Sequence, residues 1–85
     1  MRVIWKYEIP HGSGKHLVNM RWNAKPLAVG VQYCDRLVVW CEVDSTTTDV
    51  YRLVSVADTG DEVPSVGEYV GTVTMAGDLV VHVYM

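Results

Sequence analysis

The chain has 85 residues, of which 49% are hydrophobic and 20% are charged, and its net charge is −3. This apolar content excludes intrinsic disorder, and the length is too short for two domains that each bury a core, so we expect one domain over residues 1–85. Valine occupies 17 positions and phenylalanine none. Because β-branched residues favour pleated strands, the composition predicts a β protein.

Alternation of hydrophobic and polar residues predicts the strands of the first half of the chain. The hydrophobic side of a first strand consists of Val3, Trp5, Tyr7 and Ile9. A glycine-containing turn at 10–14, a short strand at 15–20 and an irregular connection at 21–26 follow. Two further strands form a hairpin with the hydrophobic faces Leu27, Val29, Val31, Tyr33 and Leu37, Val39, Cys41, Val43. These faces meet if 34–36 is the turn and Tyr33 opposes Leu37.

The second half of the chain continues the strand pattern. Its predicted order is a polar loop at 44–48, a strand at 49–56, a long loop at 57–68 and two strands at 69–75 and 79–85. Between the last two strands the residues fit either a two-residue or a three-residue turn, and we favour the three-residue turn 76–78. That choice places Tyr69, Gly71, Val73 and Met75 beside Leu79, Val81, Val83 and Met85. The sum predicts a small all-β antiparallel sandwich or barrel of six or seven short strands, with little or no helix.

The second faces of the two hairpins are too apolar to face water. They consist of Ala28, Gly30, Gln32, Val38, Trp40 and Glu42 in one hairpin, and of Val70, Thr72, Thr74, Val80, His82 and Tyr84 in the other. Either the Trp and Tyr rings on these faces close the core of a small barrel, or the faces bind a partner. The simplest partner is a second copy of the chain. The candidate interface residues are Gln32, Val38, Trp40, Val70, Thr72, His82 and Tyr84. We therefore expect a homo-oligomer, dimer or higher.

Charge is distributed unevenly along the chain. Residues 1–36 carry a balance of +4 and residues 37–85 a balance of −7. Either the first part forms a basic face for phosphate or an acidic partner, or strands from both parts interleave and neutralise one another, which we favour. The candidate anion contacts are Lys15, His16 and Arg21. Because no dense basic cluster exists, we do not expect binding to duplex nucleic acid.

Two features of the sequence resemble parts of catalytic sites, but neither supports a catalytic function. Segment 11–16 resembles part of a phosphate-binding loop, but it has Ile9 where the first glycine is required and His16 where Ser or Thr is. His82 sits in mid-strand beside Thr72, with no carboxylate or cysteine placed near it, so we expect a structural histidine. The sequence therefore predicts no enzyme activity and no catalytic residues.

Metal sites are not indicated either. The residues available for zinc are His11, His16, Cys34 and Cys41, and they lack a recognised spacing. The acidic residues Asp58, Asp61 and Glu62 share the long loop but do not follow a calcium-loop pattern. We expect no metal and no cofactor.

Several segments, in order along nearly the whole chain, carry a family resemblance. They are Ile4-Trp5-Lys6-Tyr7-Glu8, Val29-Gly30-Val31-Gln32, Trp40 with Val43-Asp44, Tyr69-Val70-Gly71-Thr72 and Gly77-x-Leu79-Val80-x-His82-Val83. In these segments the chain resembles a family of short phage- and prophage-encoded proteins of unknown function. It departs from that family at 34–36, where its turn is one residue longer. The resemblance implies a phage origin and assigns no catalytic or binding residues.

These observations lead to a functional hypothesis. We expect a non-enzymatic phage accessory protein that self-associates in the host cytoplasm and binds a host protein or a defence-related ligand. The alternatives are a small virion or tail-associated structural protein, and a nucleotide-signal sponge with a pocket lined by Lys15, His16 or Arg21. The first residues lack the apolar region of a secretory signal, and the longest apolar run, 37–41, is too short for a membrane helix.

Overall fold

The computed structural model describes residues 1–10 and 12–85, and this part of the chain forms seven strands and one short 3₁₀ turn. The strands are β1 (Arg2–Glu8), β2 (Gly14–Arg21), β3 (Lys25–Gln32), β4 (Arg36–Asp44), β5 (Asp49–Asp58), β6 (Tyr69–Met75) and β7 (Leu79–Tyr84). The 3₁₀ turn η1 (Ala76–Asp78) joins the last two strands. The predicted all-β fold class is confirmed.

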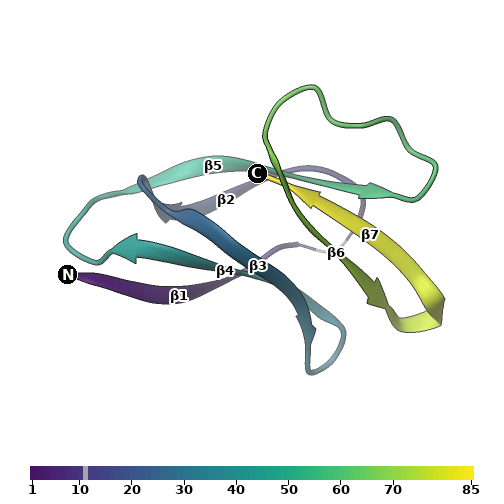
Figure 1. Ribbon diagram of the computed structural model, residues 1–85, viewed down its shortest axis with the longest axis horizontal. Coiled ribbons are helices and arrows are strands. Elements are labelled where there is room, and N and C mark those ends of the chain that lie inside the picture. The colour runs from purple at the N-terminus through teal and green to yellow at the C-terminus, as the bar shows by residue number, and fades with distance from the viewer. Residues whose placement is uncertain (11) are drawn as a thin grey trace.

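The strands form two antiparallel sheets that pack as a sandwich (Figure 1). Sheet A has the order β1-β4-β3, and sheet B has the order β2-β5-β7-β6. The chain therefore crosses between the sheets after β1, after β2 and after β4. The part of the chain that the structure describes contains no helix long and apolar enough to span a membrane.

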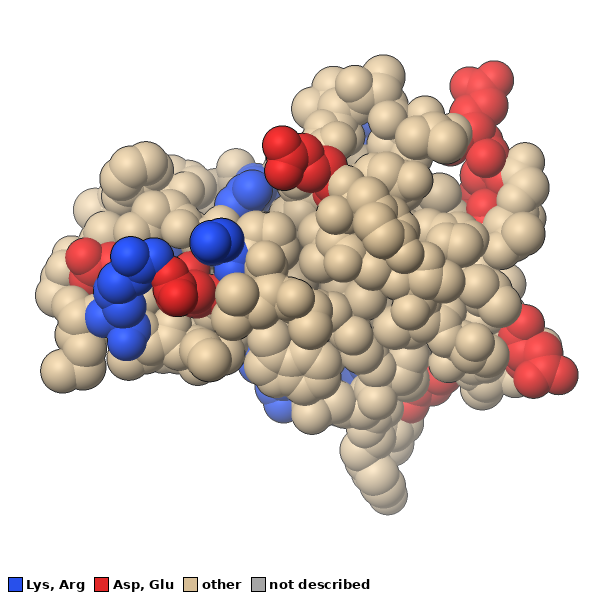
Figure 2. Space-filling view, in the orientation of Figure 1, with Lys and Arg blue, Asp and Glu red and all other residues tan. Residues whose placement is uncertain are grey.

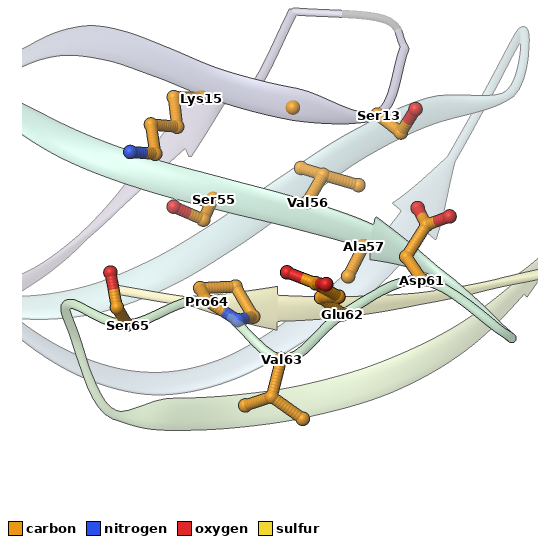
Figure 3. A pocket seen from close by; sticks show the side chains of 11 residues that line it. Ser13, Lys15, Ser55, Val56, Ala57, Asp61, Glu62, Val63, Pro64 and Ser65 are labelled. Atoms are coloured by element: carbon orange, nitrogen blue, oxygen red, sulfur yellow. The ribbon is translucent and has the colours of Figure 1, made fainter.

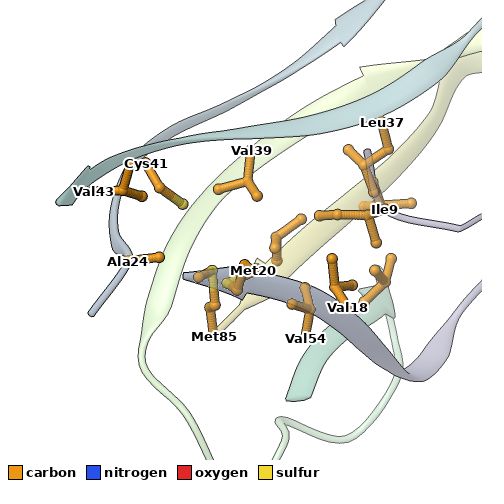
Figure 4. Close-up of a cluster of buried hydrophobic side chains, with 13 residues drawn as sticks. Ile9, Val18, Met20, Ala24, Leu37, Val39, Cys41, Val43, Val54 and Met85 are labelled. Atoms are coloured by element: carbon orange, nitrogen blue, oxygen red, sulfur yellow. The ribbon is translucent and has the colours of Figure 1, made fainter. Parts of the chain in front are cut away.

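Both sheets contribute alternate residues to one hydrophobic core. The core consists of Ile9, Val18, Met20, Ala24, Leu37, Val39, Cys41, Val43, Val54, Val56, Val81, Val83 and Met85. Figure 4 shows side chains of β4 pointing across the sandwich toward those of β2 and β5. The period-two pattern of β4 accounts for this, since its alternate residues Leu37, Val39, Cys41 and Val43 all face sheet B.

The register of the central hairpin differs from the prediction. Val31 pairs with Leu37 and Gln32 with Arg36, so the predicted pair of Tyr33 with Leu37 is wrong. The turn closes earlier because Cys34 and Asp35 both adopt positive φ, at 61° and 58°. Tyr33 consequently lies in the turn and is 89% exposed.

A bulge also removes one predicted core residue from β3. The register shifts between Pro26 and Ala28, so Leu27 has no partner in β4 and is exposed. The pattern of alternating residues predicted Leu27 inside the core. The extra residue of the bulge is the physical reason that it lies outside.

The C-terminal hairpin has the predicted three-residue turn. Met75 pairs with Leu79 and Val73 with Val81, as the preferred register requires. A bulge between Tyr69 and Gly71 then shifts the register, so Tyr69 pairs with Tyr84 and not with Met85. The same bulge turns Val70 toward the core, which corrects the prediction that it lies on the second face.

Candidate functional site on the outer face of sheet B

The long loop between β5 and β6 folds over part of the outer face of sheet B. Ser55 and Ala57 of β5 are on this face, because they pair with Tyr84 and His82 of β7 and alternate with core residues. Both are nonetheless buried, and loop residues 61–65 line a hollow together with them. The chain thus covers part of an apolar second face by itself, without a partner.

The hollow beside this loop has a volume of about 390 Å³ (Figure 3). Lys15 of β2 pairs in register with Ser55 of β5 and contributes the basic group of the lining. Asp61 and Glu62 of the loop contribute two carboxylates. An anion bound here would meet these carboxylates as well as the ammonium group, so the lining favours a polar ligand of mixed charge.

A row of hydrogen bonds ties the loop to the outer face of β6 and β7. His82 bonds through Nδ1 to the Thr72 hydroxyl at 2.8 Å and through Nε2 to the Thr59 hydroxyl at 2.9 Å. The Thr72 hydroxyl also bonds to the Tyr69 hydroxyl at 2.5 Å. The Tyr69 ring packs edge-on against Tyr84, with 5.6 Å between centroids. The predicted structural role of His82 agrees with this network, which occupies both ring nitrogens.

An apolar patch lies next to the hollow on the same face. Leu17 of β2 pairs with Leu53 of β5, one step along the face from the pair Lys15 and Ser55. Leu17 is 66% exposed and the neighbouring Tyr51 is 70% exposed. We call Leu17, Tyr51 and Leu53 the Leu17 patch. Adjacent exposed side chains of this size are typical of surfaces that bind a partner.

The Leu17 patch is absent from the residues predicted above, although the sequence carries a signal for it. In β2 the inward residues are Val18 and Met20, so Leu17 is an apolar residue out of phase with the core. Tyr51 and Leu53 are likewise out of phase with Val54. Apolar residues on the polar side of the alternation could have indicated this surface.

The predicted interface residues fall on two separate faces. On sheet A, the Trp40 ring lies over Gly30, where an added Cβ would be 2.7 Å from the ring. Val38 is only 2% exposed, so its side chain offers little surface, and Gln32 accepts a hydrogen bond from the Lys6 ammonium at 2.6 Å. On sheet B the structure brings Thr72, His82 and Tyr84 together. Their role as an interface stays a prediction.

The predicted anion contacts do not converge. Lys15 lines the hollow, whereas the side chain of its neighbour His16 bonds to the Gly12 carbonyl oxygen at 2.9 Å. Arg21 is at the other end of β2, roughly 20 Å from Lys15 at the usual rise per strand residue. Its guanidinium pairs with Asp49 at 2.7 Å and lies 5.0 Å from the Trp5 ring centroid.

Ion pairs join the basic first part of the chain to the acidic second part. Arg2 pairs with Glu42 across β1 and β4, and Arg21 pairs with Asp49 across β2 and β5. Figure 2 shows basic and acidic side chains together near the N-terminal end of the molecule, with acidic side chains alone at the opposite end. Interleaving of the two parts, the interpretation that the sequence favoured, accounts for these pairs.

The cysteines and acidic residues also have definite environments. Cys34 is exposed and Cys41 is buried, and burial raises the pKa of the Cys41 thiol to about 11. Asp61 accepts a hydrogen bond from the Asp58 main-chain N–H at 2.9 Å. Among the described residues no group of three or more His, Cys, Asp or Glu is placed to hold a metal ion. The zinc combination that included His11 lies partly outside those residues.

The strands and their pairing define a two-sheet antiparallel β-sandwich with an exposed apolar patch on the outer face of one sheet. The sequence model of a family described as "Domain of unknown function (DUF7352)" matches residues 1–85, and the chain belongs to this family. No curated protein and no solved structure matches the chain. Membership in a family of unknown function agrees with that part of the resemblance, and the phage origin stays a prediction.

Proposed function

We propose that this protein is a non-enzymatic binding module that self-associates and binds a protein of the host cell. The observation that carries the proposal is the Leu17 patch beside the hollow on sheet B. Exposed leucine and tyrosine side chains gain free energy when a partner covers them, while the adjacent Lys15 and loop carboxylates supply polar contacts that orient it.

Two features of the titratable side chains favour binding over catalysis. Both nitrogens of His82 are engaged by threonine hydroxyls, so the ring would have to break a hydrogen bond to exchange a proton with a substrate. The Cys41 thiol is buried and its pKa is raised, which keeps it in the unreactive protonated form.

The setting that we propose is a phage or prophage, with the protein acting as an accessory factor in the host cytoplasm. The resemblance of segments such as Ile4-Trp5-Lys6-Tyr7-Glu8 to phage-encoded proteins supports this setting. A small non-enzymatic module would suit such a role, because it would act by occupying a surface of a host protein.

Affinity capture with matched surface variants tests the proposal. Leu17→Lys places a charge in the centre of the patch, and we expect it to lose a host protein that the unchanged chain retains. Tyr33→Ser changes a side chain that is even more exposed, at the tip of a different hairpin, and serves as the control. Equal recovery by both variants, or no specific recovery by the unchanged chain, would contradict the proposed binding surface.

A further inference from the structure

The outer edge of β1 carries main-chain hydrogen-bonding groups that no strand of the described chain uses. Ile9 N–H donates to the Leu37 carbonyl at 2.9 Å, and Ser45 N–H donates to the Met1 carbonyl at 3.0 Å. Hydrogen-bonded pairs alternate in an antiparallel ladder, so the odd-numbered residues of β1 bond to β4. The outward N–H and C=O groups therefore belong to Arg2, Ile4, Lys6 and Glu8.

The edge strands β3 and β6 are protected from pairing with another strand. Each carries a bulge, between Pro26 and Ala28 in β3 and between Tyr69 and Gly71 in β6. They also pack against each other, since an added Cβ at Gly71 would lie 2.8 Å from Val29 Cγ2. Bulges, proline and close packing are common ways to protect a sheet edge.

The edge of β2 is open, but it cannot use all of its outward groups in pairing with a second copy without opposing like charges. Trp22 N–H donates to the Thr48 carbonyl at 3.0 Å, so the outward groups of β2 belong to Lys15, Leu17, Asn19 and Arg21. The antiparallel pairing that uses all four of these outward residues places Lys15 opposite Arg21 of the other copy. Two cations directly opposite each other are destabilising.

The edge of β1, in contrast, is complementary to itself. When two β1 strands pair antiparallel about Trp5, Arg2 opposes Glu8 of the second copy and Ile4 opposes Lys6. All four outward residues then exchange two hydrogen bonds each with the residue opposite. A shift of two residues in one direction places Arg2 opposite Lys6, and a shift in the other direction places Lys6 opposite Lys6. Only the Trp5-centred register uses every outward group without opposing like charges.

We infer that β1 is the self-association edge, and that two copies join their A sheets through antiparallel β1 strands centred on Trp5. The inference rests on the self-association in the proposed function and specifies where it occurs. Ion pairs within each chain extend the alternation of positive and negative charges across the strands. Glu8 contacts Arg36 at 3.4 Å, and Arg2 contacts Glu42. Across the joined strands the row Arg36, Glu8, Arg2, Glu42 alternates in sign on the outer face of one six-stranded sheet.

Apolar surface on β1 adds to this complementarity. Ile4 is 64% exposed on the outer face, and Trp5 is 37% exposed on the face toward sheet B. In the inferred register the two Trp5 residues are directly opposite each other across the two-fold axis. Aromatic residues opposite one another in neighbouring strands stabilise a sheet, and closed two-fold pairing leaves no free β1 edge for further growth.

Two charge variants and their mixture test the register. Glu8→Arg makes both ends of β1 basic, and Arg2→Glu makes both ends acidic. Each variant alone opposes like charges in the inferred register, so light scattering is expected to show dimerisation weakened roughly tenfold or more. An equimolar mixture opposes unlike charges at both contacts, so we expect the dimer mass to return. Each substitution also alters ion pairs within its own chain, and it does so equally alone and in the mixture. Recovery of the dimer in the mixture therefore cannot come from a change in folding.

The possible results distinguish an error in the β1 register from a failure of the proposed self-association. If the unchanged chain is a dimer and the single variants dimerise equally well, or if the mixture stays monomeric, the β1 register is wrong while self-association stands. If the unchanged chain is a monomer at all concentrations tested, both self-association and the inferred edge are contradicted.

Discussion

At the scale of single residues, the two cysteines have opposite environments although both belong to the central hairpin region. Cys34 is exposed in the turn, whereas Cys41 faces the core from β4. Burial raises the pKa of Cys41 from 9.0 to about 11, and the positive charge of Arg52 offsets this only in part. The thiolate is the reactive form, so only Cys34 is available to an alkylating reagent in the folded protein.

Alkylation of the native protein is therefore expected to add one label per chain, as counted by intact-mass spectrometry. Cys34→Ser should add none, and both proteins should gain one further label in denaturant. Rapid double labelling of the native chain would show that Cys41 is not buried as described.

Asp44 supplies a pH-dependent contribution to stability. Hydrogen bonds from the Thr46 hydroxyl and main-chain N–H, together with the N-terminal ammonium group, lower the pKa of Asp44 from 3.8 to about 2. Because the folded state holds this proton less tightly than the unfolded state, the contribution is complete above about pH 4. It is lost as the pH falls from about 4 to about 2.

Thr46→Val removes the hydroxyl hydrogen bond and leaves the Asp44 carboxylate in place. We expect this variant to have a lower melting temperature than the unchanged chain at pH 6, and the difference to shrink as the pH approaches 2. Melting curves followed by circular dichroism measure it. A difference that is constant with pH would mean that the hydroxyl does not act through the charge of Asp44.

At the scale of elements, β4 is the centre of sheet A and supplies the core with valine side chains. Val39 is fully buried, whereas Val63 in the long loop is exposed. We expect Val39→Ala to lower the free energy of unfolding by about 2 kcal/mol, from lost burial and a residual cavity. The matched Val63→Ala should change it by less than about 0.5 kcal/mol. Urea denaturation of the two variants makes the comparison, and equal losses would contradict the assigned core.

The close approach of β3 and β6 closes one side of the sandwich. Gly71→Ala introduces a methyl group against Val29, and overpacking of this kind costs about 1–3 kcal/mol. Val29→Ala makes room for that methyl group. In a double-mutant cycle the loss for the pair should be smaller than the sum of the single losses. Additive losses would show that the two strands do not meet at these residues.

Sequence periodicity predicted the strands because valine at alternate positions marks the side of each strand that faces the core. It did not predict the bulge at Val70, where an extra residue reverses the side that the chain presents. It also misplaced Tyr33, since the turn is set by the left-handed conformations of Cys34 and Asp35. A local backbone conformation of this kind leaves no trace in a hydrophobic pattern.

The candidate site was less predictable than the fold. The covering of Ser55 and Ala57 depends on where the long loop folds, which its irregular sequence does not specify. The sequence suggested that the apolar second faces need a partner. On sheet B the long loop covers part of the apolar second face. On sheet A the Trp40 ring lies over Gly30 and covers part of the other.

At the scale of the whole molecule, the sandwich has one protected side and one open side. The bulged strands β3 and β6 protect one side, and the edges of β1 and β2 are open on the other. Charge then distinguishes the two open edges, because β1 can pair through all of its outward groups without opposing like charges and β2 cannot. A partner protein at the Leu17 patch and a second copy at β1 would therefore occupy different surfaces.

Hydrogen exchange of individual main-chain amides, measured by NMR at increasing protein concentration, is the decisive test of self-association through β1. We predict that the outward amides of Ile4 and Lys6 exchange at least about tenfold more slowly as dimers form. The outward amides of Leu17 and Asn19 in β2 should keep exchanging at the same rate. Exchange at Ile4 and Lys6 that stays as fast as at Leu17 and Asn19 at every concentration would contradict self-association through β1.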